Sequence, residues 1–180
     1  MARSLSVETD RLLTLRGDGF SSAPRVCGVE QKVTENPMSV AILLLVEDDA
    51  NLQSMLEIAL SGEGFDIVLA SNGTEAIAAL DADGVRFKGV VTDIRLGAGP
   101  NGWEVGKHAR ETAAGMPIIY MSGDSAHEWS ANGVPESVML QKPFVIGQLI
   151  TAITTLLNQV STATALSEAM AHDKTPKLAS

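Results

Sequence analysis

The fold of this protein is decided first by residues 40–49, which read VAILLLVEDD. A continuous run of seven apolar residues is typical of a strand in a parallel sheet with both faces covered, because neither side of such a strand meets water. Three carboxylates follow the run directly, so they lie at the carboxyl end of the predicted strand. We therefore expect a buried parallel sheet with an acidic cluster at one edge.

Strand-like and helix-like patterns alternate from this stretch to about residue 160. In residues 50–61, the apolar residues Leu52, Met55 and Leu56 recur at helical spacing, and two glycines end the pattern. The other predicted strands are residues 65–69, 89–92, 117–121 and 137–140; the other predicted helices are residues 74–80, 103–113, a short one near 126–131, and 145 to about 160. This alternation predicts an α/β fold with a doubly wound, five-stranded parallel sheet.

The two ends of the chain lack this alternation. In residues 1–37 apolar residues are sparse and glycine and proline are frequent, so we expect a disordered extension. Met38 directly precedes the first strand, which raises the alternative that native translation starts there. We expect one folded domain over residues 38–160, with no second domain. For residues 161–180 we expect the end of the last helix and then a disordered tail.

Composition and charge exclude several function classes. The net charge is −9, and residues 1–37 hold equal numbers of acidic and basic side chains, so the surplus of carboxylates follows Met38. Direct nucleic-acid binding is therefore disfavoured, since it depends on neutralising phosphates with Lys and Arg. No apolar run approaches the roughly 20 residues that span a bilayer. Cys27 is the one cysteine and no secretion leader opens the sequence, so we expect a cytoplasmic protein without a membrane contact.

Polar residues follow the other predicted strands as well. Asp93 follows the third strand, Ser122 the fourth and Lys142 the fifth. Because the carboxyl ends of parallel strands line one crevice, we expect these residues to meet Glu47 and Asp48 there. Crowded carboxylates repel one another unless a cation lies among them, and oxygen ligands of this kind suit magnesium.

Such a crevice supports phosphoryl transfer. A carboxylate can attack phosphorus and form an acyl phosphate, and Asp93 is the best candidate for that nucleophile. The charge on the phosphoryl oxygens must be stabilised by a metal, a cation and a hydroxyl donor. Asp48, Lys142 and Ser122 are of the types that supply them.

Four segments carry a family resemblance. LLLVEDD, VVTDIRL, PIIYMSGD and QKPF resemble the signature segments of response-regulator receiver domains of two-component signalling, in the same order, and the resemblance covers about 120 residues. It implies a flavodoxin-like (βα)5 fold with strand order 2-1-3-4-5. It also implies that Asp93 is the phosphoacceptor, that Glu47 and Asp48 are the acidic pair for magnesium, or manganese in its place, and that Asp48 is a direct ligand. The backbone carbonyl of Arg95 is implied as a further ligand.

The resemblance implies a switch as well, and here the sequence departs from the family. Ser122 takes the place of the switch hydroxyl and Lys142 that of the phosphate-binding lysine, with a cis peptide bond before Pro143. The switch position that usually holds an aromatic ring is Met139. We therefore expect the signal to leave through the loop after Ser122 and its short helix, where Trp129 is a plausible reporter.

The resemblance implies a stand-alone response regulator. It takes a phosphoryl group from a histidine kinase or a histidine phosphotransfer protein and acts on a downstream protein partner in a phosphorelay; it is not an enzyme beyond its own phosphorylation and slow dephosphorylation. One alternative is a magnesium-dependent aspartyl-phosphate phosphatase, which is disfavoured because Arg95 stands where such hydrolases need a second aspartate. The other is a pseudo-receiver that binds a partner without phosphorylation. We also expect Arg95 and Asp124 to pair across the pocket.

Overall fold

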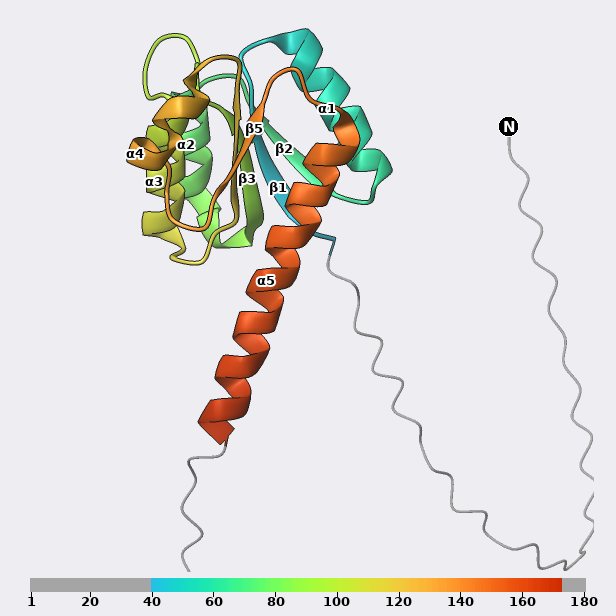
Figure 1. Ribbon diagram of the computed structural model, residues 1–180, viewed down its shortest axis with the longest axis vertical. Helices are drawn as coiled ribbons and strands as arrows, with labels where there is room; N and C mark the ends of the chain where they lie inside the picture. Colours follow the sequence, from blue (N-terminus) through green and yellow to red (C-terminus); the bar gives the residue numbers. More distant parts are fainter. Residues whose placement is uncertain (1–39, 173–180) are drawn as a thin grey trace, which may run out of the picture. The chain divides into compact units, whose positions relative to one another are not determined.

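The computed structural model describes residues 40–172 (Figure 1). Five parallel strands form one sheet in the order β2-β1-β3-β4-β5, as predicted. The strands are β1 (Ile42–Val46), β2 (Asp66–Ala70), β3 (Phe87–Asp93), β4 (Ile118–Ser122) and β5 (Val138–Gln141). The helices are α1 (Ala50–Gly62), α2 (Gly73–Asp83), α3 (Gly102–Thr112), α4 (Trp129–Asn132) and α5 (Ile146–His172), with short 3-10 turns at η1 (Gly84–Arg86) and η2 (Ser125–Glu128). The predictions for residues 1–37 lie outside the described residues.

Strand β1 lies between β2 and β3 and separates two apolar layers. Leu44 and Val46 belong to the layer under α2 and α3, whereas Leu43 and Leu45 belong to the layer under α1 and α5. These four side chains are at most 1% exposed. The unbroken apolar run is thus explained, because helices cover both faces of this strand.

The helix that follows Asp93 is held close to the end of β3. Asn101 and Glu104 form a capping box at the start of α3, in which each side chain accepts a hydrogen bond from the other residue's backbone N–H. A Cβ atom at Gly102 would lie 2.1 Å from the carbonyl oxygen of Asp93, so only glycine allows this approach. The contact fixes the backbone beside the predicted phosphoacceptor.

Helix α5 is longer than predicted. The predicted helix reached about residue 160 with its end within residues 161–180, and the observed helix continues to His172. The predicted disordered tail at residues 173–180 lies outside the described residues. Ser and Thr are frequent after residue 160 and favour an end, but no glycine or proline follows to stop the helix before Pro176. The other predicted boundaries lie within three residues of the observed ones.

Part of α5 also has the length and composition of a membrane span. Ile146–Ser167 comprises 22 residues with a mean hydropathy of 1.2, and it is the one such helix in the described part of the chain. The sequence analysis considered continuous apolar runs only, and α5 contains none of that length because Gln, Ser and Thr interrupt its apolar residues. The test is weak here because the first half of α5 packs on the sheet as a core helix.

Gly106 in α3 offers a test of how tightly this layer packs. A Cβ atom there would lie 2.1 Å from the hydroxyl of Tyr120 and 2.8 Å from its Cζ. Tyr120 is fully buried, with its ring centroid 4.6 Å from that of Trp103. We expect Gly106→Ala to lower the free energy of unfolding by about 1–3 kcal/mol, because the ring cannot move away without displacing its neighbours. Urea denaturation measures this.

The matched control is Gly147→Ala in the first turn of α5. A Cβ atom there would meet nothing within 4 Å, so the change should leave stability unaltered or raise it by up to about 1 kcal/mol through the better helix propensity of alanine. If Gly106→Ala behaved like the control, the tight contact with Tyr120 would be wrong.

Candidate functional site

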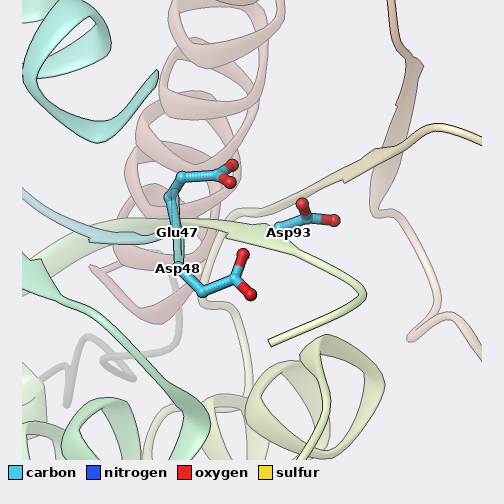
Figure 2. Close-up of side chains that lie close together, drawn as sticks. All are labelled: Glu47, Asp48 and Asp93. Atoms are coloured by element: carbon cyan, nitrogen blue, oxygen red, sulfur yellow. The ribbon is translucent and has the colours of Figure 1, made fainter. Parts of the chain in front are cut away.

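The predicted acidic cluster forms at the carboxyl edge of the sheet. Figure 2 shows the side chains of Glu47 and Asp48 extending toward that of Asp93, so that the three carboxylates lie close together. One oxygen atom from each lies within 4.8 Å of the others. Glu47 and Asp93 are 2% and 9% exposed, whereas Asp48 is exposed, so the cluster is open on one side. Hard carboxylate oxygens at this spacing are a donor set that fits a divalent cation such as magnesium.

Lys142 lies against two of the three carboxylates. Its Nζ atom donates a hydrogen bond of 2.6 Å to Asp93 Oδ2 and one of 2.9 Å to Glu47 Oε2. The loop that carries it is held by a bond of 2.6 Å from the Lys142 N–H to the carbonyl oxygen of Ser122. The Lys142–Pro143 peptide bond is cis, as predicted.

Burial and charge act in opposite directions within this group. Burial raises the pKa of Glu47 despite its hydrogen bond with Lys142, and the charge of Asp93 raises it further. Burial alone would lower the pKa of Lys142, but its contacts with Asp93 and Glu47 outweigh burial and raise it. The lysine is therefore firmly charged at neutral pH, whereas the ionised Glu47 is held at a cost to stability.

Two further predicted residues, Arg95 and Asp124, lie on the loops that follow β3 and β4. The backbone N–H of Arg95 donates to Asp93 Oδ1 over 3.2 Å, which places this peptide beside the acidic group. The Arg95 guanidinium forms an ion pair with the carboxylate of Asp124, which confirms the predicted contact across the pocket. Both side chains are mostly exposed, at 71% and 60%.

Ser122 is the last residue of β4, where the chain turns toward α4. The residue is 1% exposed, and its hydroxyl accepts a hydrogen bond of 2.7 Å from the Ser125 N–H at the start of η2. Farther along this segment, the indole N–H of Trp129 donates to Ser137 Oγ over 3.0 Å, and Trp129 remains 38% exposed. The short η2–α4 segment is thus tied at one end to the predicted switch hydroxyl.

Met139 occupies the position at which the family usually has an aromatic ring. It is partly buried and pairs in register with Tyr120 on β4. The Tyr120 hydroxyl lies 3.5 Å from the Val134 N–H, within the layer that also buries Trp103. An aromatic ring is therefore present one strand away from the usual position, but it is fixed in the core.

Gln53 supports the site and was not predicted from the sequence. Its side-chain amide donates to the carbonyl oxygens of Glu47, over 3.1 Å, and Ala70, over 2.9 Å. These bonds tie α1 to the end of β1, where the acidic residues begin. The indication in the sequence is its spacing, because Gln53 shares the buried face of α1 with Leu56 and Leu60.

Comparison with known proteins decides the family. Residues 43–154 match the sequence profile of the response regulator receiver domain. This chain belongs to the response regulator receiver domain family. Such receiver domains are the phosphoacceptor signalling domains of two-component systems, so the family predicted from the four segments is confirmed.

Solved structures agree with this assignment. The receiver domain described here is similar to a response regulator receiver protein from Sinorhizobium medicae, with a TM-score of 0.65 and 45% identity; the match covers 67% of this chain and 96% of that one. It shares its fold with the receiver domain of a sensor histidine kinase from Pseudomonas aeruginosa, which was crystallised with a magnesium ion in its active site cleft. That match has a TM-score of 0.58 and 22% identity, and it covers 67% of this chain and 99% of that one.

A curated relative is considerably longer. The chain is 29% identical over 124 residues to the uncharacterized transcriptional regulatory protein YkoG of Bacillus subtilis, a match that covers 68% of this chain and 53% of YkoG. The chain therefore spans about half the length of this relative. The family resemblance covers the receiver domain and does not extend to the rest of YkoG.

The raised pKa of Glu47 leads to a stability prediction. In the metal-free protein, we expect Glu47→Gln to raise the free energy of unfolding at neutral pH by about 1 kcal/mol, because the variant buries a neutral amide in place of a carboxylate. Urea denaturation in the presence of EDTA measures this difference. The exposed Glu63 provides the control, since Glu63→Gln should change stability by less than about 0.5 kcal/mol.

The same reasoning predicts the pH dependence. The folded-state pKa of Glu47 lies above its unfolded value, so this carboxyl contributes stability below the unfolded pKa of about 4.3 and loses that contribution as pH rises through the folded pKa. The advantage of Glu47→Gln should therefore disappear below about pH 4. A difference that persists in acid would contradict burial of the charge as its cause.

Proposed function

We propose that this receiver domain accepts a phosphoryl group on Asp93 from the phosphohistidine of a histidine kinase or a histidine phosphotransfer protein. The observation that carries the proposal is the contact of Lys142 with Asp93 and Glu47 inside a cluster of three carboxylates. A carboxylate oxygen of Asp93 forms the new bond to phosphorus while the bond from phosphorus to the histidine nitrogen breaks. The bonding electron pair leaves with the imidazole.

Each remaining residue of the site has a role in this proposal. The carboxylates of Glu47, Asp48 and Asp93, with the backbone carbonyl of Arg95, would hold magnesium, or manganese in its place. Such an ion would supply positive charge beside the three carboxylates and the incoming phosphoryl group. The magnesium ion in the related Pseudomonas aeruginosa receiver domain supports this choice of metal. Lys142 exchanges one of its carboxylate contacts for a phosphoryl oxygen, and the Ser122 hydroxyl donates to another.

The change at Ser122 is read out through the η2–α4 segment. Ser122 Oγ already accepts a hydrogen bond from the Ser125 N–H, so a movement of this hydroxyl toward a phosphoryl group pulls on the start of η2. Met139 provides no ring that could flip between two positions. Trp129, on the same short segment and partly exposed, reports the movement through its fluorescence.

The protein acts as a stand-alone regulator through contact with a downstream protein in a phosphorelay, without direct nucleic-acid or membrane binding and without an enzyme activity on other substrates. The surplus of carboxylates after Met38 supports the absence of DNA binding. The Sinorhizobium medicae receiver protein supports a stand-alone regulator, because the match covers 96% of that chain and so leaves little of it outside the receiver domain. We place the protein in the cytoplasm, where its kinase partner presents the phosphohistidine.

The decisive test is intact mass after incubation with magnesium and acetyl phosphate. We expect wild type to gain one phosphoryl group and Asp93→Asn to gain none, because the amide is not a nucleophile for this reaction. The matched control is Asp66→Asn, at the amino end of β2 and thus on the opposite edge of the sheet, which should be phosphorylated like wild type. Without a shift in wild type, with either acetyl phosphate or a phosphorylated kinase, a pseudo-receiver becomes the better description.

The Arg95–Asp124 ion pair leads to a prediction about the lifetime of the phosphorylated state. The pair joins the loop that follows β3 to the loop that follows β4, and in this proposal it restricts the water that hydrolyses the acyl phosphate. We expect Asp124→Asn to shorten the lifetime about 1.4- to five-fold, which corresponds to the roughly 0.2–1 kcal/mol that an exposed ion pair typically contributes. Loss of the phosphorylated mass after removal of the donor measures the rate.

A double-mutant cycle separates the pair from its single members. Because both changes break the same contact, Arg95→Gln combined with Asp124→Asn should hydrolyse no faster than Asp124→Asn alone. High salt should shorten the wild-type lifetime and leave that of the double variant unchanged, since salt screens exposed charges. Additive effects of the two substitutions would contradict a role for the pair.

A further inference from the structure

Helix α5 has two different surroundings along its length. In its first half, Leu149, Ile153 and Leu156 are at most 6% exposed and pack against the sheet. From Asn158 onward, every side chain that the structure describes is exposed. At about 1.5 Å per residue, the 27-residue helix is about 40 Å long, and Figure 1 shows its second half running past the edge of the sheet.

The exposed half has an uncharged surface as far as residue 167. Residues 146–167 contain no charged side chain. The hydroxyls of Ser161, Thr162 and Thr164 bond to carbonyl oxygens four residues earlier on the same helix, so they are satisfied without a partner. Large apolar side chains are open to solvent, with Leu166 at 62% and Met170 at 76% exposure. A helix of this composition gains little stability by itself in water, because it has no ion pairs and many β-branched residues.

A groove runs beside this surface. It has a volume of about 900 Å³ and lies at the amino ends of β4 and β5, between Pro117 and Val138 on one side and α5 on the other. The wall that α5 contributes includes Leu156, Val160 and Ala163, and Ser167 extends it. Val160, Ala163 and Ser167 follow Leu156 at intervals of four, three and four residues. The same intervals separate the residues of the first half that pack against the sheet, Leu149, Ile153 and Leu156. An apolar stripe with this spacing is the pattern by which helices pair.

We propose that the second half of α5 pairs with the same segment of a second copy of this chain. A twofold interface sets a surface against itself, so a surface that carries net charge opposes its own pairing. The chain has a net charge of −9 and its copies repel one another in general, but residues 146–167 carry no charge. The groove beside this segment contains two charged residues of opposite sign, Glu136 and Arg110. The Arg110 guanidinium already donates hydrogen bonds to the carbonyl oxygens of Met116 and Ala114.

The pairing surface lies away from the phosphoacceptor. The groove is at the amino edge of the sheet, whereas Asp93 ends β3 at the carboxyl edge. Two paired copies therefore leave both acidic clusters and both α4 segments open to other proteins. The inference does not depend on phosphorylation, and its test needs neither magnesium nor a phosphodonor.

Sedimentation velocity of the full chain over a concentration series tests the proposal. We expect wild type to sediment as a reversible dimer. Ala163→Glu should raise the dissociation constant at least about tenfold, equivalent to 1.4 kcal/mol, because it sets a carboxylate against its own copy. Leu166→Asn, which adds no charge, should weaken the dimer in the same direction.

The matched control is Ala165→Glu. Ala165 lies two residues beyond Ala163, about 200° around the helix and so on its far side. This variant has the same composition as Ala163→Glu and should dimerise like wild type. Circular dichroism should show equal thermal unfolding of the two variants when they are compared as monomers in dilute solution, which excludes unfolding as the reason for a difference.

Three outcomes would overturn the proposal. The first is a wild-type protein that is monomeric at every concentration, and the second is an equal effect of the two glutamates. The third is binding of wild type, but not of Ala163→Glu, to vesicles of uncharged phosphatidylcholine together with a monomeric state in solution. That result would assign the apolar surface to a lipid bilayer instead of a second copy.

Discussion

Three carboxylates held within a few ångströms of one another are the constraint on which the rest of this receiver domain depends. Glu47, Asp48 and Asp93 repel one another, and burial adds to the cost for Glu47. Lys142 offsets part of this repulsion through direct contacts with Glu47 and Asp93. The oxygen atoms of the three carboxylates also fit a divalent ion. The arrangement of these carboxylates therefore favours positive charge beside them.

The apolar layers supply the energy that keeps this group together. Strand β1, between β2 and β3, is buried on both faces, and the acidic residues continue directly from its end, so they are placed by a rigid element. Gln53 and the Gly102 approach to Asp93 fix the backbone on either side. A stable sheet thus carries an edge that is locally unfavourable, which is the usual relation between stability and function in a binding site.

Much of this arrangement was predictable because two simple rules apply to parallel sheets. Strands buried on both faces appear as apolar runs, and their carboxyl ends meet at one edge, so residues 46 positions apart such as Glu47 and Asp93 could be placed together. Gln53 was missed because the role of a polar residue on a buried helix face cannot be predicted until its hydrogen-bond partners are known. Met139 indicated an altered switch, but the aromatic core around Tyr120 emerged only from the packing.

The sequence by itself determined the α/β fold, the family, the acidic cluster and its lysine, because these follow from local patterns and from residues at strand ends. Only the tertiary structure decided which charges touch, namely Lys142 with Asp93 and Glu47, and Arg95 with Asp124. It also decided where α5 leaves the sheet and how much of it remains uncovered. Contacts between residues distant in the chain depend on the packing of whole elements, and no local pattern of residues encodes that packing.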